Sequence, residues 1–406
     1  MRSNWKTIGS LLSSTMLAVT LSACGSGNNG GSEGAAAVQS SAAGEASTSP
    51  VLTTTAPAAT VSASPVDALY EQAKKEGKVI VYSTSGRAND AAKTFMKQYP
   101  GIQVEVSKVK SDQMMDKVAR EQDAGQFNPD VLVTKEVSGA VDFEMVKQGR
   151  YLKYLPEDIA PHEDEPFRTQ AESVAGYAEF RTLWYNSDHY DKPPVTNWWD
   201  LTTPEWKGKV YTADPVGDPS FMNLFSTFAV HADDMAAAYK MKFGKDIELH
   251  GTENAGYEFI KQLLDNQLVT LDGSTDVLDA IGKKDSDALA IAVTGEVADL
   301  KEEGWHAKPI YDLKPKTSVV DAGYFFLAKN APHEAAAKLF IRWMLGEADG
   351  QGAGIEPFNE VGSWVPRDDV KTKNEIAFDQ LNLWNYDGEA LYKIEPKVRD
   401  FWIKNK

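Results

Sequence analysis

From Val66 onward, apolar positions with a helical period alternate with short apolar runs that are flanked by turn residues. In the first part of this region the pattern predicts helices over 67–77, 88–99, 111–124 and 140–148, and strands over 78–82, 102–106 and 130–133. Helices and strands that alternate in this way indicate an α/β sheet with helices on both faces.

The alternation continues through the rest of the chain. It predicts strands over 181–186, 210–213, 288–293 and 323–328, and helices over 220–230, 254–266, 275–281 and 334–345. A short helix and a turn are expected within 198–210. Because about 340 folded residues exceed what one hydrophobic core usually supports, we expect two α/β lobes.

The start of the chain has a different pattern. A basic start with Arg2 and Lys6 leads into an uncharged, largely apolar run over 8–21. This run is shorter than the roughly 20 apolar residues of a membrane span, and it is typical of a secretory signal peptide, here residues 1–23. It ends in Leu-Ser-Ala-Cys24, which resembles the lipobox of bacterial lipoproteins and implies that a lipid is attached to Cys24.

Residues 24–65 consist almost entirely of Gly, Ser, Ala, Thr, Asn and Pro after the cysteine. Such a stretch buries too little apolar area to offset the entropy of ordering, so we interpret it as a disordered tether. A lipid anchor followed by a tether places the folded part at the outer face of the cytoplasmic membrane, as in a Gram-positive-type envelope.

Charge and cysteine content exclude several classes of function. The net charge is −17, and loss of residues 1–23 with their two basic residues makes it −19, which argues against nucleic acid as a partner. The charge does not decide the sign of a ligand, because a cleft can differ from the surface. No cysteine follows Cys24, so disulfides, cysteine nucleophiles and cysteine-ligated zinc are excluded from the folded part.

Several strings resemble the extracytoplasmic solute-binding proteins of ABC transporters, and more narrowly the type 2 periplasmic-binding fold group that contains the ferric-ion binders. They occur in the expected order over 66–370. The strings are Ala73-Lys-Lys-Glu-Gly-Lys-Val-Ile-Val-Tyr-Ser83, Asn128-Pro-Asp-Val-Leu-Val133, Gly149-Arg-Tyr-Leu152, Leu183-Trp-Tyr-Asn186, Trp199-Asp-Leu-Thr-Thr-Pro-Glu-Trp-Lys-Gly-Lys209 and Leu327-Ala-Lys-Asn-Ala-Pro-His333.

The resemblance implies an α/β clamp of two lobes joined by a two-segment hinge, with a small solute held between the lobes and delivered to ABC permease subunits. It implies that lobe 1 contains residues 66–178 and 322–406, and that lobe 2 contains residues 179–321. The chain is then expected to cross near 176–185 and to return near 318–324. We expect a monomer without a cofactor.

Ligands of open α/β sheets lie beyond the carboxyl ends of the strands, often at helix N-termini. Applied to the predicted strands, this rule gives a set of candidate ligand-binding residues: Ser83, Thr84, Ser85, Arg87, Thr134, Ser220, Ser274, Thr275 and Thr294. Their hydroxyls, together with free backbone N–H groups, favour a small anionic solute such as a phosphate ester, phosphonate, carboxylate or chelated metal.

Other interpretations stay open for these residues. Any one of the hydroxyls can be an ordinary helix N-cap, and Arg87 can pair with a ligand anion or be a solvated charge. An iron(III) or chelated-iron receptor of the same fold is the main alternative. Ferric binders of the group typically use adjacent tyrosines in the second lobe, where this chain has Ala290-Ile-Ala-Val-Thr294, and no Tyr-Tyr pair occurs in the sequence.

Two further classes of function remain as alternatives. A surface sensor or adhesion lipoprotein would bind a partner protein, and a cell-envelope hydrolase would need catalytic residues. The sequence lacks G-x-S-x-G, H-E-x-x-H, the Walker A loop and the EF-hand loop. We therefore predict a binding protein rather than an enzyme, without a resident metal, and expect the acidic string at His162 to be a solvated loop.

Overall fold

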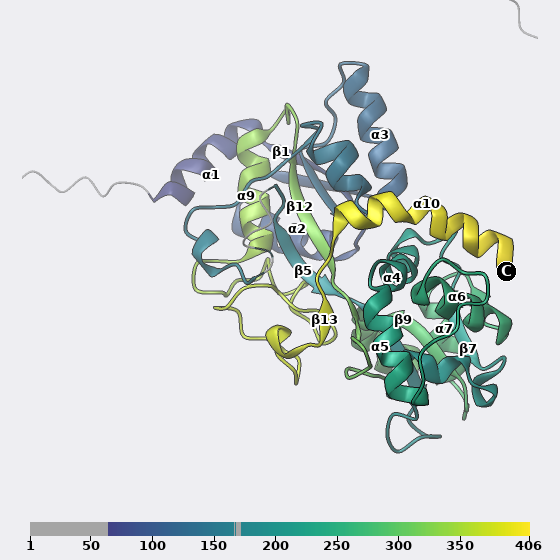
Figure 1. The fold of residues 1–406 in the computed structure, drawn as a ribbon. Helices are drawn as coiled ribbons and strands as arrows, with labels where there is room; N and C mark the ends of the chain where they lie inside the picture. The colour runs from purple at the N-terminus through teal and green to yellow at the C-terminus, as the bar shows by residue number, and fades with distance from the viewer. Residues whose placement is uncertain (1–63, 166, 168–171) are drawn as a thin grey trace, which may run out of the picture. The chain divides into compact units, whose positions relative to one another are not determined.

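The apolar runs of the first part of the chain become strands of one sheet in the computed structural model, which describes residues 64–165, 167 and 172–406 (Figure 1). These residues belong to a single compact unit. The sheet of the first lobe has the order β2-β1-β3-β12-β4, with β5 also paired to β12. Its strands are β1 (Lys78–Ser83), β2 (Gln103–Lys108), β3 (Val131–Lys135), β4 (Tyr151–Leu152), β5 (Ala175–Glu179) and β12 (Asp321–Ala328).

The first lobe also contains helices. They are α1 (Pro65–Glu76), α2 (Arg87–Gln98), α3 (Ser111–Asp123), η1 (Val141–Val146), η2 (Ala160–His162), α9 (Glu334–Leu345) and η7 (Phe378–Gln380). Helix α1 begins at Pro65 because the Ser64 hydroxyl accepts a hydrogen bond from the Asp67 N–H, which completes a capping box. Phe95 of α2 meets Phe340 of α9 edge to face in the core, with ring centroids 5.1 Å apart.

The second lobe contains a five-stranded sheet in the order β10-β6-β9-β7-β8. Its strands are β6 (Arg181–Asn186), β7 (Val210–Ala213), β8 (Val269–Leu271), β9 (Leu289–Val293) and β10 (Ala307–Pro309). Its helices are η4 (Trp198–Thr202), η5 (Pro204–Trp206), α4 (Pro219–Val230), α5 (Ala232–Phe243), α6 (Ala255–Asp265), α7 (Ser274–Gly282), η6 (Thr294–Asp299) and α8 (Leu300–Glu303). Trp198 and Trp199 are fully buried here against Phe259.

The chain passes between the two sheets at two neighbouring strands. Only Phe180 separates β5 of the first sheet from β6 of the second. On the return, β12 begins at Asp321, which is paired directly with Glu179 at the end of β5. A small sheet of β11 (Ser318–Val319) and β13 (Leu383–Trp384) lies beside this return. The two crossing strands therefore form the hinge, with an acidic residue on each.

The C-terminal helix α10 (Gly388–Asn405) differs from the sequence-based expectation, which assigned all of 322–406 to the first lobe. It packs mainly against α4 and also against α6 of the second lobe (Figure 1). Trp402, which is fully buried, lies against Phe225 with ring centroids 4.7 Å apart. At its other end, Tyr392 stacks on Phe143 of η1 in the first lobe. The apolar residues of α10 thus bury against the second lobe, and its first turns contact the first.

Most predicted elements are present in the structure within a few residues of their expected ends. The strand predicted over 323–328 lies within the fully buried β12. Helix α5 and the short strands β4, β5, β8, β10, β11 and β13 were not predicted, and no residue range was predicted for the C-terminal helix α10. The signal peptide, Cys24 and the tether up to residue 63 lie outside the described residues. Among the residues described, no helix has the length and apolar character that a membrane span requires.

Candidate functional site

A cleft of about 600 Å³ is lined by loops and helix starts of both lobes. The first lobe contributes the segment between β1 and α2, the residues after β2, the start of α3 and the end of β3. The second lobe contributes the start of α4, the residue after β8 and most of η6. The cleft therefore lies where polar strand ends were expected to meet, beyond the carboxyl ends of strands in both sheets.

The segment between β1 and α2 is closed by its own serine hydroxyls. The Ser83 hydroxyl accepts a hydrogen bond from the Ser85 N–H at 3.1 Å and donates one to the Ser85 carbonyl oxygen at 2.8 Å. The Ser85 hydroxyl accepts from the Arg87 N–H at 3.2 Å. Ser83 is buried and does not line the cleft, whereas Thr84, Ser85 and Arg87 do. These hydroxyls thus shape the start of α2 at the edge of the cleft.

The Arg87 side chain is bound by other residues of the protein. Its Nη1 lies 2.7 Å from Glu179 Oε1 and 3.3 Å from the Ser363 hydroxyl oxygen. The other carboxylate oxygen of Glu179 accepts a hydrogen bond from Lys135 Nζ at 2.7 Å. Lys135 also lies 3.0 Å from Asp321. A buried carboxylate at the hinge is therefore held between two cations that line the cleft.

Arg181 completes this hinge network through an ion pair with Asp321. Burial acts to raise the pKa of Glu179, but Lys135 and Arg87 together outweigh it and lower the pKa to about 2. For Lys135, burial acts to lower the pKa, and Asp321 and Glu179 raise it above its usual value. Glu179 and Lys135 are therefore both charged at neutral pH. The network joins three basic side chains, those of Arg87, Lys135 and Arg181, to two acidic ones, those of Glu179 and Asp321.

The wall of the second lobe carries carboxylates. Asp218 accepts a hydrogen bond from the Ser220 N–H at 3.0 Å and caps α4, and both residues line the cleft. Asp272, Glu296 and Asp299 line it as well. Burial, together with the charges of Asp299 and Glu179, raises the pKa of Glu296 to about 7. This wall therefore becomes more negative as the pH rises through neutrality.

Four of the nine residues predicted to bind ligand line the cleft, namely Thr84, Ser85, Arg87 and Ser220. Besides Ser83, four others do not. Thr134 is buried and bonds to the Ser111 hydroxyl, Ser274 accepts from the Val293 N–H, and Thr294 accepts from the Phe180 N–H. Thr275 is exposed outside the cleft. The hydroxyls of Thr134, Ser274 and Thr294 bond to other parts of the chain and do not act as the helix N-caps that the sequence offered as the alternative.

Several charged lining residues were not predicted. They are Lys108, Lys110, Asp112, Lys135, Glu179, Asp218, Asp272, Glu296, Asp299 and Glu360. The strand-exit rule contained a signal for some of them, because Lys108 ends β2 and Asp272 follows β8 directly. Applying the rule to charged side chains as well as hydroxyls would have found these two. Glu179 gave no such signal, because β5 was not predicted.

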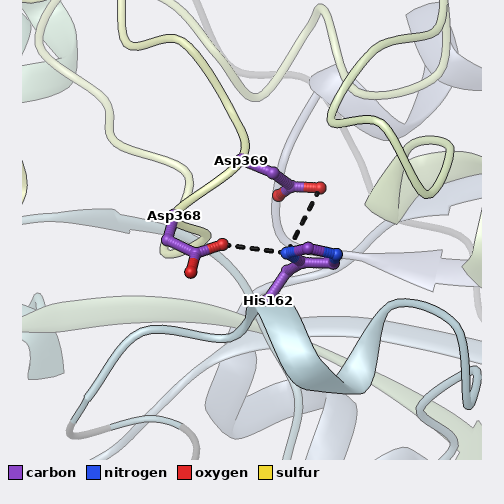
Figure 2. Close-up of side chains that lie close together, drawn as sticks. All are labelled: His162, Asp368 and Asp369. Carbon is purple, nitrogen blue, oxygen red and sulfur yellow. Dashed lines mark hydrogen bonds and ion pairs between the residues drawn. The ribbon is translucent and has the colours of Figure 1, made fainter.

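Figure 2 shows a second group of polar side chains, formed by His162, Asp368 and Asp369. His162 Nδ1 lies 2.9 Å from Asp368 Oδ1 and 3.8 Å from Asp369 Oδ2. Asp369 is already bound by the Arg367 guanidinium through two hydrogen bonds of 2.9 and 2.6 Å. These side chains therefore form a local network of polar contacts with Arg367, outside the cleft.

A family model described as bacterial extracellular solute-binding protein matches residues 90–380, which is well over half of the chain. The chain belongs to this family. The family resemblance expected from the ordered sequence strings is therefore confirmed, and membership implies an extracytoplasmic location. A search of curated proteins found no match.

Solved structures confirm the fold of this solute-binding protein. It is similar to apo ferric ion-binding protein A of Pasteurella haemolytica, with 20% identity and a TM-score of 0.62 over 81% of this chain and 98% of that chain. It is also similar to iron-bound HitA from Pseudomonas aeruginosa, with 17% identity and a TM-score of 0.61 over 81% of this chain and 99% of that chain. A third similar structure is AfuA from Actinobacillus pleuropneumoniae with exogenous fructose-6-phosphate bound. Its identity is 18% and its TM-score is 0.59, over 81% of this chain and 98% of that chain. At these identities the likeness shows the two-lobed fold.

The cleft of this solute-binding protein has one tyrosine among the lining residues that the structure describes, Tyr177. Burial raises its pKa, and its ring lies under the Arg87 guanidinium at 5.0 Å. Residues 290–294, where the resemblance places an iron-binding tyrosine pair, form the end of β9 and the start of η6. The chemistry of the lining is therefore that of lysine, arginine, carboxylate and hydroxyl groups.

Proposed function

We propose that this protein is the substrate-binding component of an ABC import system, which captures a small solute between its lobes and delivers it to a membrane permease. The cleft supports the proposal most directly, because residues of both lobes line its volume of about 600 Å³. Sites of roughly this size suit small molecules. The protein binds its solute and does not transform it.

The hinge supports a clamp mechanism. Glu179 and Asp321 lie opposite each other where the two crossing strands leave the first sheet, and Lys135 bonds to both. A solute that contacts both walls binds the closed arrangement more tightly than the open one, and so shifts the population toward closure. The closed form is the one that the permease would recognise.

An acidic group of the solute fits the first-lobe wall. Helix α2 begins at Arg87, so its N-terminal N–H groups and the positive end of its dipole lie next to Thr84 and Ser85 in the cleft lining. Helix N-termini bind phosphate and carboxylate groups for this reason. An anionic group therefore occupies this end of the cleft in our proposal.

Attachment to the membrane is a separate part of the proposal. Cleavage before Cys24 and lipidation of its thiol would hold the folded part at the outer face of the cytoplasmic membrane. Fractionation of cells that express the wild type and Cys24→Ala tests this. Wild-type protein in the membrane fraction with a lipidated N-terminal cysteine by mass spectrometry is the expected result. Equal release of both forms into the soluble fraction contradicts anchoring.

The binding function is tested with purified folded protein. Native mass spectrometry first identifies any co-purified solute, and thermal melting then screens metabolites, including phosphate esters, carboxylates and ferric citrate. A solute at a hundredfold excess over its dissociation constant stabilises the protein by about 2.7 kcal/mol. No co-purified solute and no shift with any metabolite would favour a protein-binding lipoprotein instead. Conversion of a bound compound into a product would show an enzyme.

A further inference from the structure

The two walls of the cleft differ in charge. The wall of the first lobe carries every lysine and arginine among the described lining residues, together with three acids: Arg87, Lys108, Lys110 and Lys135, against Asp112, Glu179 and Glu360. The wall of the second lobe carries four acids and no basic residue in the part of the lining that the structure describes: Asp218, Asp272, Glu296 and Asp299. One wall is therefore weakly positive and the other strongly negative.

The ion pairs within the cleft increase the difference in charge between the two walls. On the first wall, Glu179 is already bound by two of the cations. Lys108 and Lys110 form no ion pair within the described part of the chain. On the second wall, Asp272, Glu296 and Asp299 have neither an ion pair nor a side-chain hydrogen bond to any residue that the structure describes. Uncompensated charges of opposite sign thus line opposite sides of one cleft.

We infer that the solute is a small zwitterion, with its acidic group toward the start of α2 and the lysines, and a protonated amine toward the acids of the second lobe. This inference rests on the proposed function and names its substrate class. A solute with only an acidic group would bring its charge close to four carboxylates, which disfavours closure. A solute with only an amine would leave the first wall without a partner.

Glu296 and Asp299 are the specificity-determining residues in this arrangement. Both lie in η6, which begins directly where β9 ends. The two carboxylates interact unfavourably with each other, which helps to raise the pKa of Glu296 to about 7. A protonated amine placed between them relieves this repulsion. Closure on a zwitterion is therefore favoured by contacts on both walls.

The test uses four pools of small solutes, which are anions, cations, zwitterions and neutral compounds, with thermal melting followed by calorimetry. The pools include two matched trios: O-phosphoethanolamine, ethyl phosphate and ethanolamine, and γ-aminobutyrate, butyrate and butylamine. The expected result is a zwitterion that binds at least tenfold more tightly than its two single-charge analogues.

The matched variants are Glu296→Gln with Asp299→Asn in the cleft, and Glu248→Gln on the exposed surface of the second lobe. The double variant is expected to weaken zwitterion binding at least tenfold, and Glu248→Gln to leave it unchanged. Unchanged affinity in the double variant overturns the inference, with far-ultraviolet circular dichroism as the check on folding.

The pools separate this inference from the proposed function. Binding of anions or cations without any zwitterion overturns the inference and leaves solute capture standing. A co-purified solute that lacks a basic nitrogen does the same. No binding from any pool and no co-purified solute contradicts both.

Discussion

The Arg87 guanidinium lies 2.7 Å from the Glu179 carboxylate, so the first residue of α2 is joined by an ion pair to the last residue of the hinge strand β5. Glu179 is 5% exposed, and Lys135 holds its second oxygen. The start of α2, which lines the cleft, is thereby joined to one of the two strands that connect the lobes.

Glu179→Gln is expected to destabilise the protein by about 3 kcal/mol, because it removes the buried carboxylate that pairs with two half-buried cations. Denaturant unfolding measures the loss. Asp90→Asn is the matched control, because Asp90 pairs with Lys93 at 2.8 Å on the exposed face of α2, the helix that begins at Arg87. Removing that exposed pair is expected to cost less than about 1 kcal/mol. Equal effects of the two variants would contradict a stabilising role for the hinge network.

Glu179 also contributes to the acid sensitivity of the wild type. Lys135 and Arg87, working against burial, hold its pKa at about 2, below the value of about 4.3 for an unfolded glutamate. A carboxylate with a lowered pKa adds stability that is complete above pH 4.3 and is lost as the pH falls toward 2. The difference in stability between wild type and Glu179→Gln should therefore shrink over this range. A constant difference from pH 7 to pH 2 would show that the charge of Glu179 does not matter.

Glu296→Gln is expected to have the opposite pH dependence. Burial and the neighbouring acids raise the pKa of Glu296 to about 7, so the fold binds its proton more tightly than the unfolded chain does. The contribution of Glu296 to the free energy of unfolding of the wild type therefore falls as the pH rises from about 4.3 through 7. The variant removes this loss and is expected to be more stable than the wild type at pH 8 by about 1–3 kcal/mol.

Unfolding of both proteins at pH 5 and pH 8 measures this effect. The variant must be compared with the wild type at each pH. Burial also raises the pKa of Glu136 to about 7, which makes the stability of both proteins depend on pH in the same way. Glu248→Gln, an exposed change of the same chemistry, is expected to show no pH-dependent difference. A stability gain of Glu296→Gln that is equal at both pH values would contradict a raised pKa.

The sequence predicted the α/β class because its helices and strands carry clear local periodicity, and it predicted two lobes from the number of folded residues and from the family resemblance. The hydrophobic run before Ser83 and the helical run after Arg87 identify β1 and α2 without any tertiary information. Strand β5 could not be found in this way. Its partner β12 lies more than 140 residues later in the chain, and only that pairing shows it to be a strand. The position of Glu179 was therefore hidden as well.

The same limit applies to the candidate site. Thr84, Ser85 and Ser220, which were predicted from the strand exits, line the cleft, because the topology places the carboxyl ends of strands together. Which hydroxyls remain available depends on packing. Thr294 follows β9 as expected, but its hydroxyl accepts a hydrogen bond from the Phe180 N–H in the hinge. Local sequence does not show that partner, which lies more than 110 residues away.

Trp402→Ala is expected to destabilise the protein by about 3–5 kcal/mol through the cavity that it leaves between α10 and α4. Trp402 is fully buried against Phe225, and Val398 lies buried one turn before it. The neighbouring Ile403 is 59% exposed, so Ile403→Ala is the matched control and is expected to change stability by less than about 0.5 kcal/mol. Chemical unfolding compares the two. A small loss for Trp402→Ala would mean that α10 is not part of the second-lobe core.

Gly362→Ala tests the contact between the first-lobe loop at Gly362 and the start of η6 at Thr294. Gly362 has φ of +86°, and an added Cβ would meet the Thr294 carbonyl oxygen at 2.0 Å. Gly125 has φ of +71° but open space around it, so Gly125→Ala reports the cost of the left-handed backbone alone, about 1–2 kcal/mol. Gly362→Ala is expected to cost about 1–3 kcal/mol more, because the loop must move away from η6. Equal losses in unfolding experiments would contradict the close approach, whereas a larger loss accompanied by weaker solute binding would show that this contact supports the cleft wall formed by Glu296 and Asp299.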